Sequence, residues 1–312
     1  MSGPTPRPLV EPRDVPYEEF PASTRSTDGT HVLAADRTPR HGSAVLGVEY
    51  ARKSGRALHL HVLLPPTGPG GDERFPLVVY VQGSAWFEQQ LGTNLPALAH
   101  FARRGYVVAI AEYRPSTVAP FPAQVRDAGS AVRFLRRNAE RFHVDPERVA
   151  MWGDSSGGHT TVLAHLTDGD QEYGDEPVDA EPLALRCAVD YYGPTDIARM
   201  NEEPSIQDHT GPRSPEGVLI GGVDVLANPE RVRPTVAAHH VDPAVPRPPL
   251  LVVHGDKDRL VPFGQSVLLV EALRAAGQPV TFHRLAGADH GGPPFWTEEV
   301  LDVVDGFLRE NL

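Results

Sequence analysis

The stretch W-G-D-S-S-G-G at residues 152–158 contains a serine in a setting that favours nucleophilic chemistry. Its G-x-S-x-G pattern follows an apolar run and precedes a helix-like run, which is the context of a nucleophile elbow. Gly153 and Gly157 would leave room for the backbone at this tight turn, which would lift the hydroxyl of Ser155 above a sheet. The alternative is an ordinary glycine-rich turn, and the flanking strand and helix favour the elbow.

A serine hydroxyl becomes a strong nucleophile only when a base takes its proton and a carboxylate holds the base. Asp256 and Asp258 follow the apolar run at 250–254, and His290 lies in A-D-H-G-G after the next strand-like run. The order Ser…Asp…His is expected when the three residues lie in successive loops at one edge of a parallel sheet. We favour Asp258 as the acid because it lies further into the loop, whereas Asp256 is typical of a turn former.

The remaining pattern predicts the elements that would position these loops. Apolar runs typical of strands occupy residues 45–51, 57–64, 77–81, 106–111, 148–152, 187–192, 250–254 and 280–285. Runs typical of helices occupy residues 94–104, 122–141, 156–166, 264–276 and 297–311, of which 122–141, 264–276 and 297–311 are amphipathic. The first two strands flank a turn and predict an antiparallel hairpin, and the alternation that follows predicts a parallel sheet with helices on both faces. We therefore predict a three-layer α/β fold with a mostly parallel sheet of about eight strands.

Composition shifts divide the chain into parts. Residues 1–44 are rich in proline, threonine and arginine, which indicates an N-terminal arm or strap, and residues 45–312 are predicted to form a single α/β domain. Residues 196–248 interrupt the alternation with many prolines, and a short helix is expected after S-P-E at 214–216. A connection of this length indicates a functional loop or a cap-like insertion.

Charge and cysteine content exclude several classes of partner. The 29 lysines and arginines against 41 aspartates and glutamates give a net charge of −12, which disfavours nucleic acid and anionic membranes as partners. Cys187 is the single cysteine and is expected to be a buried small residue. No apolar run approaches the length of a membrane span and the first residues lack the apolar core of a secretory signal, so a cytoplasmic location is expected. Whether the protein forms a homo-oligomer is left open by the sequence.

Taken together, the motifs resemble those of serine carboxylesterases of the α/β-hydrolase superfamily, near the BD-FAE-like (feruloyl and acetyl xylan esterase) and hormone-sensitive-lipase-like groups. The resemblance extends from about residue 45 to the end of the chain. Besides the elbow it rests on residues 77–86, E-Y-R from Glu112, F-P-A-Q-V-R-D from Phe121, V-D-P-E-R-V from Val144, D-Y-Y-G-P-T-D from Asp190, H-G-D-K-D from His254 and D-H-G from Asp289. It implies an α/β-hydrolase fold with Ser155 as nucleophile, His290 as base and Asp258 as orienting acid, and no cofactor or metal.

The chain departs from these relatives after the first parallel strand. The relatives carry H-G-G-G-[WF] there, and this chain has Q-G-S-A-W at residues 82–86. Because an oxyanion hole needs accessible backbone amides, we predict that the amides of Gly83 and Ser84, with that of Ser156, form it. Gln82 replaces the usual histidine, and an amide side chain can support the loop in the same way. The candidate substrate-binding residues are Gln82, Trp86 and Phe87, with simple packing an equal alternative for the two aromatic residues.

These residues predict a serine ester hydrolase that acts through an acyl-enzyme. The resemblance implies a small-molecule ester as substrate, carrying a short or aryl acyl group (acetyl or feruloyl) on a sugar or small alcohol. Two alternatives stay open: an exopeptidase or amidase of the same fold, and a non-catalytic homologue that binds a ligand in the hydrolase pocket. Labelling by a fluorophosphonate would distinguish the catalytic hypotheses from the last.

Overall fold

The computed structural model describes residues 10–35, 41–67, 73–170, 173 and 181–312. The chain divides into two compact units, Met1–Thr38 and Pro39–Leu312. Within the described part of the first unit, a single 3₁₀ helix, η1 (Tyr17–Glu19), is the one regular element, and nearly all side chains are exposed. The second unit contains the sheet and every residue discussed below.

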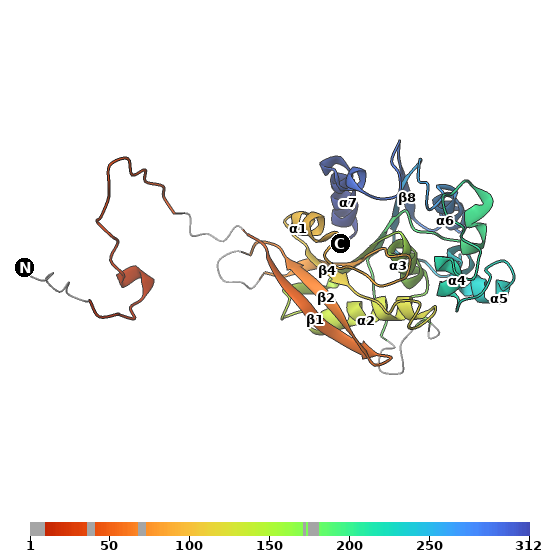
Figure 1. Ribbon diagram of the computed structural model, residues 1–312, viewed down its shortest axis with the longest axis horizontal. Coiled ribbons are helices and arrows are strands. Elements are labelled where there is room, and N and C mark those ends of the chain that lie inside the picture. The colour runs from red at the N-terminus through yellow and green to blue at the C-terminus, as the bar shows by residue number, and fades with distance from the viewer. Residues whose placement is uncertain (1–9, 36–40, 68–72, 171–172, 174–180) are drawn as a thin grey trace, which may run out of the picture. The chain divides into compact units, whose positions relative to one another are not determined.

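The second unit is built on an eight-stranded sheet in the order β1-β2-β4-β3-β5-β6-β7-β8 (Figure 1). The strands are β1 (Ser43–Lys53), β2 (Arg56–Leu64), β3 (Phe75–Val81), β4 (Val107–Ala111), β5 (Val144–Asp154), β6 (Cys187–Tyr191), β7 (Leu250–Gly255) and β8 (Val280–Leu285). The hairpin β1–β2 is antiparallel, β2 runs antiparallel to β4, and every pair from β4 to β8 is parallel. The predicted strand number and hairpin are confirmed.

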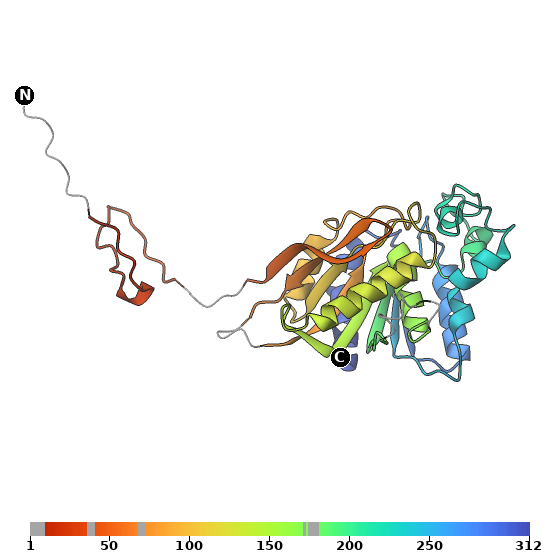
Figure 2. The same cartoon turned by 90° about the horizontal axis from the view of Figure 1, so that it is seen from below.

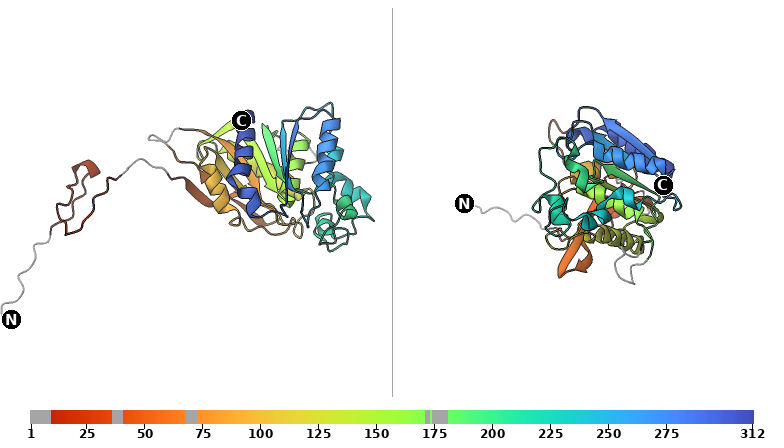
Figure 3. Two further views of the ribbon diagram at one scale, coloured as in Figure 1. Left: turned by 90° about the horizontal axis from the view of Figure 1, so that it is seen from above. Right: turned by 90° about the vertical axis from the view of Figure 1, so that its right-hand side faces the viewer.

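Helices cover both faces of the sheet. The helices are α1 (Leu95–Ala102), α2 (Ala123–Arg137), α3 (Ser156–Leu166), α6 (Gly264–Ala275) and α7 (Glu298–Asn311). Figure 2 shows α2 and α3 on one face, and the left view of Figure 3 shows α1 and α7 on the other. Alternate residues of β3 point into the two cores: Leu77 and Val79 pack with α2, α3 and α6, whereas Val78 and Tyr80 pack with α1 and α7. This alternation explains why each parallel strand is apolar throughout.

Element boundaries differ from the sequence prediction where turns intervene. Helix α2 ends at Arg137 and not at residue 141, because the chain turns back at once to begin β5 at Val144. His143 has φ 54°, a left-handed conformation that no helix contains. Strand β5 is longer than the predicted run at 148–152 because its first residues pair with Phe75 and Pro76 of β3.

The segment between β6 and β7 forms short helices. These are η3 (Ile197–Glu202), α4 (Pro215–Leu219), α5 (Pro229–Val232), η4 (Arg233–Thr235) and η5 (Ala237–His240). Helix α4 is the short helix predicted after S-P-E, and the hydroxyl of its cap, Ser214, accepts a hydrogen bond from the amide of Gly217. Apolar residues of this segment form a third buried cluster, separate from the two cores of the sheet.

Candidate active site

Ser155 lies at the sharp turn between β5 and α3. Its backbone has φ 53° and ψ −126°, a strained conformation for a residue with a side chain. The turn is held by two bonds: the amide of Ser155 donates to the carbonyl of Tyr191 at 2.8 Å, and its carbonyl accepts from the amide of His159 at 3.0 Å. A Cβ on Gly157 would lie 2.0 Å from the carbonyl oxygen of Val81, so the turn requires glycine there.

The structure brings the three predicted side chains into one chain of hydrogen bonds. Ser155 follows β5, Asp258 follows β7 and His290 follows β8, so all three lie at the C-terminal edge of the parallel strands. His290 Nε2 lies 2.9 Å from Ser155 Oγ, and His290 Nδ1 lies 2.7 Å from Asp258 Oδ2. The imidazole ring also packs edge-on against the ring of Tyr192, with centroids 4.8 Å apart.

Asp258 is buried and its carboxylate is fully bonded. Oδ1 accepts from the amides of Leu260 and Val261, each at 2.8 Å, and Oδ2 accepts from His290 and, at 3.2 Å, from His254. Burial by itself raises the pKa of Asp258, but the bonds from His254 and His290 outweigh it and hold the pKa at about 2. Asp258 is therefore a carboxylate at neutral and mildly acidic pH.

This depressed pKa predicts a loss of stability in acid. Because the folded pKa is below the ordinary value, the stabilising contribution of Asp258, on the order of 2 kcal/mol, is present above about pH 4 and lost as the pH falls towards 2. Urea titrations from pH 2 to pH 6 measure it. The free energy of unfolding should fall more steeply with acidification in the wild type than in Asp258→Asn. If the free energy of unfolding fell equally steeply in the two proteins, the lowered pKa of Asp258 would be contradicted.

His254 has a place in the site that the sequence does not reveal. Its Nε2–H lies 3.0 Å from the carbonyl of Val261 and 3.2 Å from Asp258 Oδ2, and its Nδ1 accepts from the hydroxyl of Ser266 at 2.7 Å. A histidine at the end of a buried strand is typical of packing, and His254 is indeed fully buried. It packs against the Asp258 carboxylate, whose Oδ2 is also contacted by His290.

The other acidic residue of this loop, Asp256, faces away from His290. Its carboxylate pairs with Arg284 at 2.5 Å and accepts from the amide of Gly287 at 2.6 Å. Asp289 joins the two loops that supply Asp258 and His290, because its Oδ1 accepts from the amides of both Arg259 and His290. Asp256 and Asp289 thus hold the loops in place, and for Asp256 this agrees with the turn-forming role expected from the sequence.

The amides in the turn after β3 make hydrogen bonds that the sequence did not lead us to expect. The amide of Gly83 donates to Asp154 Oδ1 at 2.9 Å, and the amide of Ser84 donates to Ser156 Oγ at 2.9 Å. Both amides predicted to face an oxyanion are thus bonded to side chains that flank Ser155. Within the described part of the chain, the amides of Ala85 and Ser156 have no acceptor.

A hydroxyl network fixes this turn against α3. The hydroxyl of Ser84 donates to the carbonyl of Phe87 at 2.7 Å, so it accepts from Tyr113 Oη at 3.0 Å. Tyr113 in turn lies 3.2 Å from Ser156 Oγ, which completes a ring of bonds with the Ser84 amide. Serine replaces glycine at position 84 relative to the pattern of the relatives, and its hydroxyl is what connects the turn to Tyr113.

Trp86 and Phe87 are not among the residues that line the cavity at Ser155, and for Trp86 the contacts are those of the packing alternative. Trp86 is 1% exposed and its indole N–H donates to His159 Nδ1 at 3.2 Å. Its ring packs in the apolar cluster of the β6–β7 segment, which includes Ile197 and Leu219. That segment has no regular sequence pattern, so the sequence gives no sign that it would cover Trp86.

A cavity of about 630 Å³ opens above Ser155 and His290. Its lining includes Ser155 and His290 together with Gln82, Ala85, Thr93, Asn94, Tyr192, Leu260, Pro293 and Trp296. Gln82 was predicted to bind substrate and does line this cavity; it is 5% exposed, and its Oε1 has no hydrogen-bond partner among the described residues. Trp296 lies in P-P-F-W after His290 and was not singled out from the sequence.

The sheet order, the nucleophile elbow and the loops at the strand ends define an α/β hydrolase. A solved structure titled as a truncated form of carbohydrate esterase from gut microbiota superposes with a TM-score of 0.77 at 28% identity, over 88% of this chain and 97% of the other. The chain also resembles esterase LipC of Mycobacterium tuberculosis, at 28% identity over 77% of this chain and 55% of LipC. Esterase 2 of Thermogutta terrifontis, with bound butyrate, has a TM-score of 0.68 at 24% identity over 86% and 94% of the two chains, which shows a shared fold.

The BD-FAE family model matches residues 60–273, and the chain belongs to this family. The prediction of an α/β hydrolase near the BD-FAE and hormone-sensitive-lipase-like esterases is therefore confirmed. The chain spans between 53% and 61% of the length of the three curated mycobacterial relatives LipC, LipM and LipQ. No helix in the described residues is long and apolar enough to cross a membrane.

Proposed function

We propose that the protein is a serine carboxylic ester hydrolase, with residues 45–312 as its catalytic domain and residues 196–248 as a cap-like insertion. The observation that carries the proposal is the unbroken chain of bonds from Ser155 through His290 to Asp258, at the wall of a cavity of about 630 Å³. A serine, a histidine and a buried carboxylate in this geometry generate a nucleophile for acyl transfer.

In the proposed reaction Ser155 Oγ attacks the ester carbonyl carbon while its proton passes to His290 Nε2. His290 then gives this proton to the alcohol oxygen as the bond between carbon and that oxygen breaks, which leaves an acyl group on Ser155. A water molecule next loses a proton to His290 and attacks the acyl carbon. The acid leaves, and the proton returns to Ser155 Oγ. Asp258 accepts from His290 Nδ1 throughout and stabilises the imidazolium.

For the oxyanion we propose the amides of Ser156 and Ala85 as donors. Ser156 is the first residue of α3, so its amide also carries the positive end of the helix dipole. Ala85 lines the cavity, and its amide has no acceptor in the described residues, whereas that of Gly83 is bonded to a carboxylate. The amide of Ser84 would be available only if it left Ser156 Oγ.

We propose a short-acyl or aryl ester of a sugar or small alcohol as the substrate. The polar side chains of Gln82, Thr93 and Asn94 line the cavity and can bond hydroxyl groups of the alcohol. Trp296 supplies an aromatic face on which a sugar or an aryl acyl group can pack. The similarity to a carbohydrate esterase supports the same class.

A panel of p-nitrophenyl esters from acetate to octanoate, with acetylated and feruloylated saccharides, tests this proposal. We expect kcat/KM to be highest for acetate or for the feruloyl saccharides and to fall as the chain lengthens. A maximum at octanoate would contradict the acyl preference. Hydrolysis of aminoacyl p-nitroanilides in preference to all esters would favour an amidase.

A further inference from the structure

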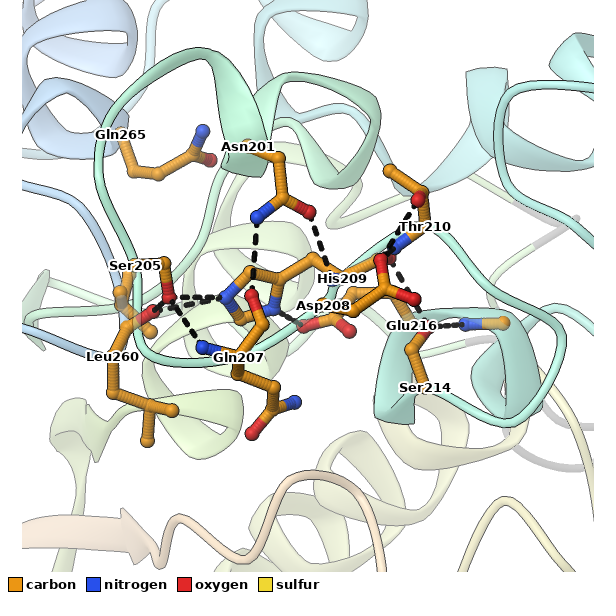
Figure 4. A network of polar contacts seen from close by, with 12 residues as sticks. Asn201, Ser205, Gln207, Asp208, His209, Thr210, Ser214, Glu216, Leu260 and Gln265 are labelled. Atoms are coloured by element: carbon orange, nitrogen blue, oxygen red, sulfur yellow. Dashed lines mark hydrogen bonds and ion pairs between the residues drawn. The ribbon is translucent and has the colours of Figure 1, made fainter.

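A buried histidine and glutamate lie in the β6–β7 segment, outside the three-residue site. His209 is 1% exposed and Glu216 is 3% exposed, and His209 Nδ1 lies 2.8 Å from Glu216 Oε1 (Figure 4). On the other side of the ring, His209 Nε2 lies 3.0 Å from the carbonyl oxygen of Leu260 and 2.9 Å from Ser205 Oγ. Leu260 belongs to the loop that carries Asp258.

Ser205, His209 and Glu216 are arranged like a second serine triad. The proton on His209 Nε2 excludes the role of a base toward Ser205. A carbonyl oxygen only accepts, so Nε2 of His209 must carry a proton in order to bond Leu260. A protonated Nε2 cannot take the proton of Ser205. The hydroxyl of Ser205 donates instead to the same carbonyl, at 2.9 Å. His209 and Ser205 are therefore two donors directed at one backbone oxygen.

The carbonyl oxygen that accepts from His209 and Ser205 belongs to Leu260, the residue whose amide supports Asp258. The amide of Leu260 donates to Asp258 Oδ1 at 2.8 Å, while its carbonyl accepts from His209 and Ser205. The side chain of Leu260 lines the cavity beside Ser155. Fixing the backbone of Leu260 thus fixes a donor to Asp258 and part of the pocket wall together.

His209 is itself held from several directions, so it can act as an anchor. Its amide donates to Asn201 Oδ1 at 2.8 Å, and its carbonyl accepts from the hydroxyl of Ser214 at 3.1 Å (Figure 4). Glu216 orients the ring from the first turn of α4. A further bond joins the two segments, because the amide of Ile206 donates to the carbonyl of Arg259 at 2.8 Å.

We propose that His209 and Glu216 are positioning residues that hold the 258–261 loop, and through it Asp258, in the geometry that His290 requires. This inference rests on the proposed ester hydrolase function. It gives the β6–β7 segment a role in the reaction besides the burial of Trp86. It also implies that movement of this segment changes the turnover rate through Asp258.

The test compares two variants of the full chain. The double variant His209→Leu/Glu216→Met removes both partners at once, because removing His209 alone would leave a carboxylate buried without its partner. The control, Glu216→Gln, keeps the bonds: its amide group can donate to His209 Nδ1 while Nε2–H still donates to Leu260. Two properties are measured: kcat and KM for p-nitrophenyl acetate per fluorophosphonate-titrated site, and the downfield proton NMR signal of the His290–Asp258 hydrogen bond.

We expect the double variant to lose about tenfold in kcat with little change in KM, and its downfield signal to shift or broaden, because small misplacements of a catalytic group are costly. Glu216→Gln should stay within about twofold of the wild type in kcat and keep the signal. A double variant that loses stability alone, with kcat per site and NMR signal unchanged, would overturn the proposal.

A third variant keeps the test decisive if the double variant does not fold. Ser205→Ala removes the second donor to the Leu260 carbonyl from a half-buried position, and we expect about a threefold fall in kcat. Unchanged kcat and an unchanged signal in this variant would count against the positioning role. The signal does not depend on substrate, so a wild type without esterase activity would refute the proposed function and still leave the positioning role measurable.

Discussion

Replacing Ser155 with alanine is expected to lower kcat for p-nitrophenyl acetate by about 10⁶-fold, to the level left by binding and the backbone donors. Ser155 Oγ is the atom that His290 Nε2 contacts at 2.9 Å, and alanine removes the nucleophile without adding volume. Because alanine would adopt the same strained φ of 53°, the free energy of unfolding should change little. Steady-state kinetics and urea unfolding of both proteins measure the two effects.

Ser43→Ala is the matched control for this variant. Ser43 is exposed at the start of β1, at the edge of the sheet, and its replacement should leave kcat unaltered. Activity in Ser155→Ala within about tenfold of the wild type would mean that another group is the nucleophile.

Asp258→Asn is expected to lower kcat by about 10⁴-fold while the protein stays folded at neutral pH. The carboxylate of Asp258 accepts from two histidines and two amides. An asparagine has one acceptor oxygen and must direct its amide group at some of these donors, which disfavours the tautomer of His290 that leaves Nε2 ready to accept the proton of Ser155. The kcat values at several pH values measure the loss.

Asp256→Asn separates the two acids of the loop. Asp256 pairs with Arg284 and not with His290, so we expect kcat within about threefold of the wild type. A larger loss in Asp256→Asn than in Asp258→Asn would reassign the acid.

The edge of the sheet at which Ser155, Asp258 and His290 lie could be predicted from the sequence, because it depends on the order and direction of the strands. Loops that follow parallel strands meet at one edge of the sheet, and β5, β7 and β8 are separated only by β6 in the sheet. The choice of Asp258 over Asp256 could be argued from loop position. It is the geometry of the loop that directs Asp258 to His290 and Asp256 to Arg284.

The surroundings of these residues could not be predicted, because they depend on segments without a regular pattern. Trp86 follows the active-site turn in sequence, but the β6–β7 segment buries it away from the cavity. The amides of Gly83 and Ser84 have neighbours, Asp154 and Ser156, whose side-chain directions are set by the strained elbow. His209 contacts Leu260, which lies 51 positions further along the chain, and no local sequence pattern indicates such a contact.

Fluorophosphonate labelling followed by peptide mapping tests the central claim most directly, because it requires an activated serine and no knowledge of the substrate. We expect one adduct per chain on the peptide that contains Ser155, and none in Ser155→Ala. Absence of labelling in the wild type, or undiminished labelling of Ser155→Ala, would contradict it.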